Sequence, residues 1–89
     1  MEILQTNRFK KMYKKLTKAQ LNDVNCAIRE IIKNPLIGDQ KVGDLSWLRV
    51  YKFKCVKQLI LFGYSFNEEV LTFIDIGSHE NFYRDLKNR

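Results

Sequence analysis

The stretch LRVYKFKC, residues 48–55, marks the point where the chain changes from helical to extended periodicity. Polar and apolar side chains alternate along it with a period of two, which is the pattern of a half-buried β-strand. This alternation places Tyr51, Phe53 and Cys55 on one face of the strand and Lys52 and Lys54 on the other. We therefore expect a sheet with a buried face and, opposite it, a face that carries cations.

Two amphipathic helices are predicted upstream of this strand, after a short first strand over residues 1–5. The first helix covers residues 7–16, where apolar side chains recur at helical spacing: Phe9, Met12, Tyr13 and Leu16. Thr17 and Gln20 then form a capping box that starts a second helix. That helix ends at Asn34-Pro35, because a residue that precedes proline is disfavoured in the α region.

Downstream of the same stretch we expect two more strands and a final helix. Residues 36–47 contain two Gly-Asp steps and are predicted to be loop. Strands are predicted over 58–65 and 70–76, and a helix from Ser78 onward. The fold class is α+β: an N-terminal strand and helical hairpin pack on one face of an antiparallel sheet of about four strands, with a short C-terminal helix.

Composition indicates one globular domain that spans residues 1–89, with 45% hydrophobic and 29% charged residues. No apolar run approaches the roughly 20 residues needed to span a bilayer, and no secretion signal is visible, so we expect a cytoplasmic protein without a membrane partner. Cys26 and Cys55 lack metal-ligand spacing and are interpreted as reduced packing residues. We therefore expect neither a metal nor another cofactor.

The charge is uneven, and this asymmetry predicts an anionic partner. Sixteen basic residues outnumber ten acidic ones, which gives a net charge of +6. Residues 1–18 contain six bases and one acid, and residues 48–62 contain four bases and no acid. Such blocks are typical of surfaces that bind nucleic acid or an acidic protein, although lysine-rich helix faces are also common without any partner.

Four side chains in the C-terminal half could form one site: Lys52, Lys54, His79 and Tyr83. His79 follows the last strand, and Tyr83 lies one helical turn further along the same side. An imidazole that moves protons, two ammoniums that stabilise phosphate charge and an aromatic that stacks a base suffice for a metal-independent ribonuclease. The alternatives are a surface helix that happens to contain the chain's one histidine, and lysines that protect a sheet edge from aggregation.

Nearly the whole chain resembles the RelE/ParE superfamily of bacterial toxins from type II toxin–antitoxin systems. The resemblance rests on the helical hairpin closed by Asn34-Pro35, the glycine-bearing loop, LRVYKFK, and a last strand that runs into GSHENFY. YKFK, residues 51–54, is similar to the basic strand of RelE-type messenger-RNA endonucleases. GSHENFY, residues 77–83, is similar to the Gly-Thr-His tail of the YafQ branch.

The resemblance implies a ribosome-dependent endonuclease in which Lys52 and Lys54 stabilise the phosphate. It makes His79 the general acid or base and Tyr83 the aromatic that stacks a base or handles a proton. The arginine that RelE has on its third strand is missing from QLILFGY, residues 58–64, and Arg49 or Lys57 could replace it. The basic blocks add expected RNA contacts from Arg49, Lys57, Lys11, Lys14 and Lys15.

Two other functions remain open at this point. One is inhibition of DNA gyrase, as in the ParE branch, which lacks the tail histidine; the other is a catalytically silent relative that only binds RNA or an antitoxin. For every branch the resemblance implies a cognate antitoxin, and the charge map predicts that it is acidic. Messenger RNA and the ribosome are the further partners of the endonuclease, and operator DNA would be contacted only through the antitoxin complex.

Overall fold

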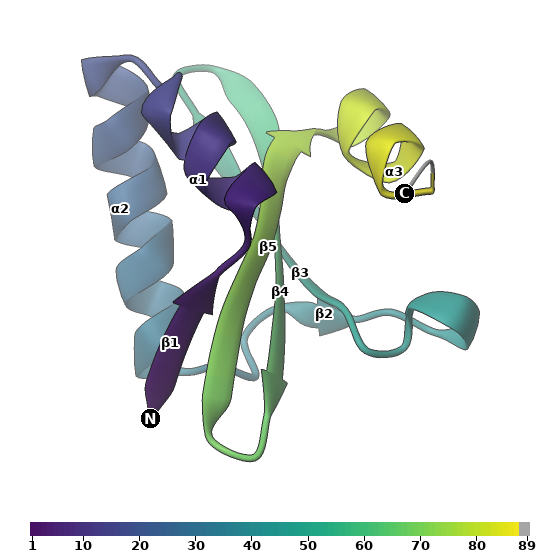
Figure 1. Ribbon diagram of the computed structural model, residues 1–89. Coiled ribbons are helices and arrows are strands. Elements are labelled where there is room, and N and C mark those ends of the chain that lie inside the picture. Colours follow the sequence, from purple (N-terminus) through teal and green to yellow (C-terminus); the bar gives the residue numbers. More distant parts are fainter. Residues whose placement is uncertain (88–89) are drawn as a thin grey trace.

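Apart from one additional short strand, β2, and a 3-10 turn, the helices and strands follow one another in the order expected from the sequence (Figure 1). The computed structural model describes residues 1–87, with side chains as far as Arg84. Its elements are β1 (Glu2–Gln5), α1 (Asn7–Lys14), α2 (Lys18–Lys33), β2 (Asp39–Gln40), the 3-10 turn η1 (Gly43–Leu45), β3 (Arg49–Cys55), β4 (Gln58–Asn67), β5 (Val70–Ser78) and α3 (His79–Lys87). The α+β class is therefore confirmed.

The helical hairpin begins and ends where local sequence signals place it. The Thr17 hydroxyl accepts a hydrogen bond from the Gln20 N–H, and the Gln20 side chain accepts one from the Thr17 N–H, so the capping box is confirmed. α2 ends at Lys33, and Asn34 adopts extended geometry before Pro35, as expected. Among the described helices, none has both the length and the apolar character needed to cross a membrane.

The sheet differs from the expected four antiparallel strands. It has five strands in the order β1-β5-β4-β3-β2. At one edge of the sheet, β1 pairs with β5 in parallel. The additional strand, β2, lies in the segment that was predicted to be loop, where Asp39 and Gln40 pair with Val50 and Arg49. Such a short strand has no periodicity of its own, because its geometry comes from the neighbour with which it pairs.

The two faces of the sheet bury separate cores. The face under the hairpin holds the larger cluster, with Phe9, Phe62, Tyr64 and Phe73 among its buried aromatic residues. The face under α3 holds the smaller one: Leu48, Val50, Leu61, Ile74 and Phe82. Figure 1 shows the hairpin and α3 on opposite sides of the strands. The strand that carries the candidate lysines is therefore covered on one face by the hairpin and only partly on the other.

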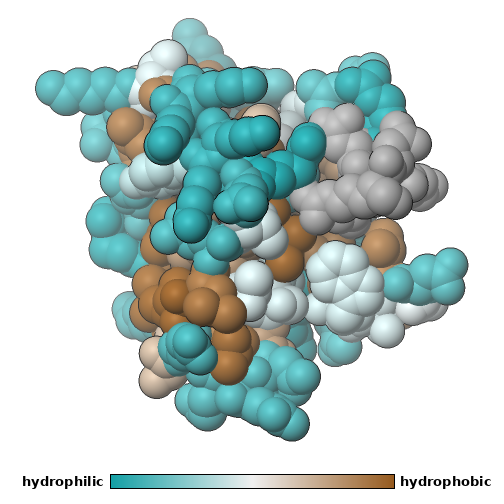
Figure 2. Space-filling view, viewed as in Figure 1, coloured by the Kyte–Doolittle hydropathy of each residue, from teal (hydrophilic) through white to brown (hydrophobic). Residues whose placement is uncertain are grey.

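Polar and apolar side chains are also unevenly distributed over the surface. Hydrophilic side chains cover the α1 end of the molecule, whereas apolar atoms gather over β1 (Figure 2). In β1 the side chains of Ile3 and Leu4 are exposed, because this strand lies at the edge of the sheet and no helix covers it.

Candidate functional site

Lys52 and Lys54 project from the α3 face of β3, as the alternation predicts. Both are exposed, whereas Tyr51 and Phe53 pack on the hairpin core with their rings 6.0 Å apart. The pairing of β2 with β3 ends at Val50, so the outer edge of β3 carries no neighbouring strand beyond that residue. An exposed pair of cations at this edge is compatible both with anion binding and with protection of the edge.

His79 and Tyr83 lie together at the start of α3, and the predicted pairing over one turn is confirmed. Their ring centroids are 5.5 Å apart in an edge-to-face arrangement. The Ser78 hydroxyl accepts a hydrogen bond from the Asn81 N–H and so caps the first turn of α3. His79 is exposed, and Tyr83 is half-buried against the smaller core.

Phe82 fixes the position of this helix. Its side chain is 1% exposed and lies over Gly63, where a β-carbon would come within 2.5 Å of the ring. The phenyl ring therefore occupies space that only glycine on β4 leaves free, and this contact holds the His79–Tyr83 turn against the sheet.

The register of the sheet sets the distance between the lysines and the imidazole. Lys52 lies opposite Leu61 on β4, and Leu61 lies opposite Gly77 on β5. Two strand spacings, about 10 Å in all, separate the backbone of Lys52 from that of Gly77. His79 follows Gly77 by two residues, so the lysines and the histidine border the same sheet face across Leu61.

Lys41 is a neighbour of this site that the sequence reasoning missed. Its ammonium lies 5.5 Å from the centroid of the Tyr83 ring, within cation–π range. Lys41 follows β2 in a segment without periodicity, so only the folded loop brings it to α3. It adds a third lysine on the same side of the molecule as Lys52 and Lys54.

The remaining candidate residues lie elsewhere. The Arg49 guanidinium donates to the carbonyl oxygens of Leu36 and Gly38, at 3.3 and 2.9 Å, and so fastens the loop after α2. Lys57 is exposed at the tip of the β3–β4 turn, with a backbone φ of 71°. The remaining three lysines lie on the hairpin side of the sheet and are exposed: Lys11 and Lys14 in α1, and Lys15 at its C-terminal cap.

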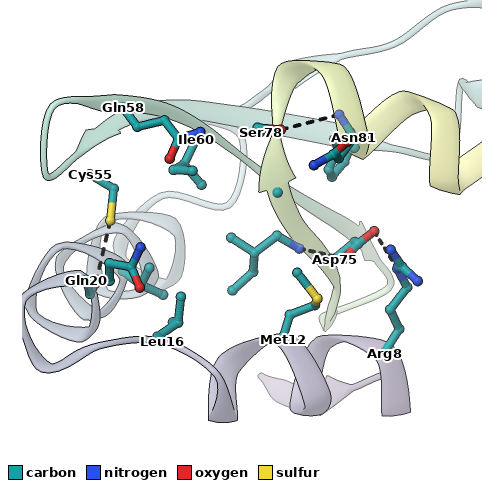
Figure 3. Close-up of a pocket in the computed structure, with 14 residues that line it drawn as sticks. Arg8, Met12, Leu16, Gln20, Cys55, Gln58, Ile60, Asp75, Ser78 and Asn81 are labelled. Carbon is teal, nitrogen blue, oxygen red and sulfur yellow. Dashed lines mark hydrogen bonds and ion pairs between the residues drawn. The ribbon is translucent and has the colours of Figure 1, made fainter.

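A separate cavity of about 290 Å³ opens between the hairpin and the start of α3 (Figure 3). Met12, Leu16 and Ile60 contribute to its apolar lining. On one side the Arg8 side chain donates to the buried Asp75 carboxylate at 2.8 Å. Neither Lys52 nor His79 lines this cavity, so it is a better receptacle for an apolar side chain than a place for phosphate chemistry.

Burial shifts the pKa of two potential nucleophiles, Tyr64 and Cys55. Burial raises the pKa of the Tyr64 phenol and of the Cys55 thiol, so both stay protonated at neutral pH and neither is an activated nucleophile. Within the described part of the chain, no three His, Cys, Asp or Glu side chains cluster in a way that could hold a metal ion.

One family model matches the chain, and several solved structures share its fold. A family model described as the ParE-like toxin of type II bacterial toxin–antitoxin systems matches residues 3–87. Among solved structures, a free mutant of the E. coli toxin RelE superposes with a TM-score of 0.70 at 17% identity, over 98% of this chain and 95% of that one.

Two further structures show the same fold. The E. coli RelBE toxin–antitoxin complex gives a TM-score of 0.67 at 20% identity, over 86% of this chain and 94% of that one. A conserved hypothetical protein of Helicobacter pylori gives 0.59 at 19% identity, over 90% and 96%. No protein with a curated description matches the sequence.

Proposed function

The chain belongs to the ParE-like toxins of type II bacterial toxin–antitoxin systems, and from this premise we propose that it is a messenger-RNA endonuclease that blocks translation at the ribosome. The observation that carries the proposal is the arrangement on the α3 face, where Lys52 and Lys54 lie about 10 Å from the strand end that bears His79 and Tyr83. The proposal places the protein in the cytoplasm, where ribosomes and transcripts are found.

The proposed reaction needs neither a metal nor a cofactor. The ribose 2′-hydroxyl attacks its own 3′-phosphate, the P–O5′ bond breaks, and a cyclic phosphate and a 5′-hydroxyl form. His79 transfers a proton, either from the attacking hydroxyl or to the leaving oxygen. Lys52 and Lys54 stabilise the negative charge that grows on the phosphate oxygens, and Tyr83 stacks on a neighbouring base.

Alanine variants of these residues test the proposal directly. Removing one group that stabilises a developing oxyanion typically slows a reaction by about 10²–10³. We expect Lys52→Ala, Lys54→Ala and His79→Ala each to lose that much cleavage, as mapped by primer extension in a translating extract. Lys10→Ala, an exposed lysine of α1, is the matched control and keeps full activity. Undiminished cleavage by His79→Ala would remove the histidine from the mechanism.

Gyrase inhibition is the second candidate, because the matching family model carries the ParE name. Induced expression would then damage DNA while transcripts remain intact, which is the opposite of the outcome for a nuclease. A silent relative would instead bind RNA in a salt-sensitive manner without any cleavage. The order in which protein synthesis and DNA replication stop after induction separates the three.

The proposed antitoxin is acidic and amphipathic. Exposed lysines on α1 favour acidic side chains, and the adjacent cavity of about 290 Å³ accepts an apolar anchor from the same segment. Because Phe82 is buried, covering the site requires less rearrangement than displacing α3. Hydrogen exchange distinguishes these routes: displacement predicts that the amides of residues 79–87 lose protection when the antitoxin binds, and covering predicts that they keep it. Operator DNA would be bound only through the antitoxin.

A further inference from the structure

A second hollow, of about 400 Å³, lies at the end of β4 beside the loop that follows β2. Its volume falls within the range of small-ligand sites. Trp47 forms part of its wall and is 49% exposed, although a tryptophan without a partner is costly to leave in water. None of the residues assigned to catalysis lines this hollow, which we call the Trp47 pocket.

The backbone of β4 offers hydrogen-bonding groups to this pocket. The two-residue turn at Glu68 and Glu69 makes Asn67 and Val70 a hydrogen-bonded pair, so the backbone N–H and C=O of Phe66 point away from β5. These two groups point toward the β3 side of β4. Because β3 begins at Arg49, which lies opposite Tyr64, no residue of β3 pairs with Phe66. One donor and one acceptor therefore face the pocket.

The side chains of the pocket favour a flat, neutral or anionic ligand. Its described lining contains one guanidinium, from Arg49, and no carboxylate. The other polar groups are the Asn67 amide and the Ser46 and Ser65 hydroxyls, which can read the donors and acceptors at the edge of a ring. The Gln40 amide already donates to the Ser46 carbonyl oxygen and accepts from Arg49, so it shapes the wall of the pocket. Trp47 supplies the aromatic surface on which such a ring stacks.

The pocket lies at the open end of β4 and borders the face that carries the candidate lysines. Ser65 and Asn67 have the same parity on β4 as Leu61, which lies opposite Lys52. Four residues separate Leu61 from Ser65, a distance of about 13 Å along the strand. Single-stranded RNA covers this distance in about two to four nucleotides, depending on how far its bases are unstacked.

The loop between β2 and β3 links the two places physically. Lys41, at the start of this loop, has its ammonium over the Tyr83 ring, and its backbone N–H donates to the carbonyl oxygen of Leu48, next to Trp47. A ligand that contacts both sites would therefore pass along a surface bordered by Lys52 and Lys41.

We infer that the Trp47 pocket binds a nucleobase of single-stranded RNA, two to four nucleotides from the phosphate that is cut, and so contributes to the choice of cleavage position. The inference rests on the proposed function, because it takes RNA as the ligand of the neighbouring lysines. An exposed tryptophan could also anchor a protein partner, but a lining of polar groups suited to a ring edge favours the base.

The chain contains a single tryptophan, so its fluorescence reports on this pocket alone. The probes are six-nucleotide, 2′-O-methyl oligoribonucleotides of one base each, which cannot be cleaved because they lack the attacking hydroxyl. We expect at least one of them to quench Trp47 emission on binding, with affinities that differ between bases. Fluorescence anisotropy of a labelled oligonucleotide measures the binding independently of the quenching.

Variants at Trp47 test the stacking contact. Trp47→Ala should weaken binding of the preferred oligonucleotide by about 5-fold to 150-fold, the range for loss of one stacked base, and should reduce the preference between bases. Trp47→Phe keeps an aromatic ring and should retain most of the affinity. Ile32→Ala, a partly exposed apolar residue on α2, is the matched control and leaves binding unchanged.

The possible results separate this inference from the proposed function. Base-dependent quenching in a protein that cleaves no RNA would reject the nuclease and support the pocket. Binding seen by anisotropy without any change in Trp47 emission would overturn the pocket, whether or not the protein cleaves. Quenching by an acidic antitoxin segment, with RNA leaving the emission unchanged, would identify a protein-docking surface and also overturn the inference.

Discussion

The two faces of the sheet are built differently. The hairpin face is sealed by α1 and α2 over a continuous aromatic core, in which Phe9 lies 5.3 Å from Phe62 and 5.2 Å from Phe73, ring centre to ring centre. The opposite face is covered by one helix of nine residues and by the loop after β2, above a cluster of five buried residues among those whose side chains the structure describes. One face has much more apolar surface to bury than the other.

This difference explains where charge can be placed. Lys52 and Lys54 are exposed, whereas Tyr51 and Phe53 on the same strand pack on the hairpin core. Exposed cations cost little where nothing covers them, but burying them would require partners. The thinly covered face can therefore hold a phosphate-binding site while the hairpin face supplies most of the folding free energy.

The largest expected effect separates the two faces by the same substitution. Phe62→Ala on the hairpin face should lower the free energy of unfolding by about 3–5 kcal/mol, as in other buried phenylalanine truncations. Phe82→Ala on the α3 face should cost less, because a terminal helix can separate from the sheet without unfolding it. Urea denaturation measures both losses, and the two rings are matched, at 0% and 1% exposed.

Hydrogen exchange provides the control for this pair. In Phe82→Ala the amides of α3 should exchange faster while those of β4 and β5 keep their protection; in Phe62→Ala protection should fall throughout the sheet. Equal losses of stability, with global loss of protection in both variants, would show that the two faces form one cooperative unit and would contradict the comparison.

The next prediction concerns the contact that holds α3 in place. In Gly63→Ala the new methyl group would lie 2.5 Å from the Phe82 ring and 3.3 Å from Leu48, so the helix must move. We expect a loss of about 2–3 kcal/mol, the upper part of the range for overpacking, and a large fall in cleavage because His79 and Tyr83 move with the helix. Circular dichroism would check that the sheet of the variant stays folded.

Gly77→Ala is the matched control, because a β-carbon there comes no closer than 3.7 Å to its nearest described neighbour, Phe82. It should leave both stability and cleavage close to those of the unchanged protein. Gly63→Ala combined with Phe82→Leu should recover part of the lost stability, since the smaller side chain makes room for the methyl group. A Gly63→Ala protein as stable and as active as the original would show that Phe82 does not need this space.

Local signals predicted most of this fold. The capping box at Thr17, the end of α2 before Pro35 and the alternation over residues 49–55 each depend on neighbours within a few residues, and the structure confirms all three. The pairing of His79 with Tyr83 was likewise expected from helical spacing, because i and i+4 share a side.

What the sequence left out depends on contacts between distant segments. β2 becomes a strand only because β3 lies beside it, and β1 pairs in parallel because the hairpin returns the chain across the sheet. The sequence alone leaves Arg49 open as a surface cation. In the structure its guanidinium donates to the carbonyl oxygens of Leu36 and Gly38, which are more than ten residues away. The position of Lys41 beside Tyr83 and the pocket around Trp47 arise from the same folded loop.

A smaller effect is expected from a single hydroxyl on the hairpin face. The Tyr64 phenol donates to the Pro35 carbonyl oxygen at 2.7 Å and accepts from the Gly38 N–H at 2.8 Å, and its side chain is fully buried. Tyr64→Phe leaves both backbone groups without this partner and should cost about 1–2 kcal/mol in urea denaturation.

The control for this prediction is Tyr51→Phe. Its hydroxyl makes no hydrogen bond to any described residue, so the change should be within about 0.5 kcal/mol of zero. If Tyr64→Phe is equally neutral, the phenol contributes little to the loop after α2, which is then held by the contacts of Arg49 and Asn34 and by the pairing of β2 with β3.

The smallest effect on stability is predicted where the effect on function is proposed to be largest. Lys52 and Lys54 project from one face of β3, about 6–7 Å apart, and make no ion pair with any described residue. Lys52→Ala removes a repulsion between like charges, so the free energy of unfolding should stay the same or rise by a few tenths of a kcal/mol. Because the term is electrostatic and exposed, the gain should disappear in about 1 M salt, where the screening length is only about 3 Å. Urea denaturation at low and high salt measures the change in the free energy of unfolding.

A loss of more than about 1 kcal/mol in Lys52→Ala would mean that the lysine stem packs on the sheet, and that the exposed face contributes to folding after all.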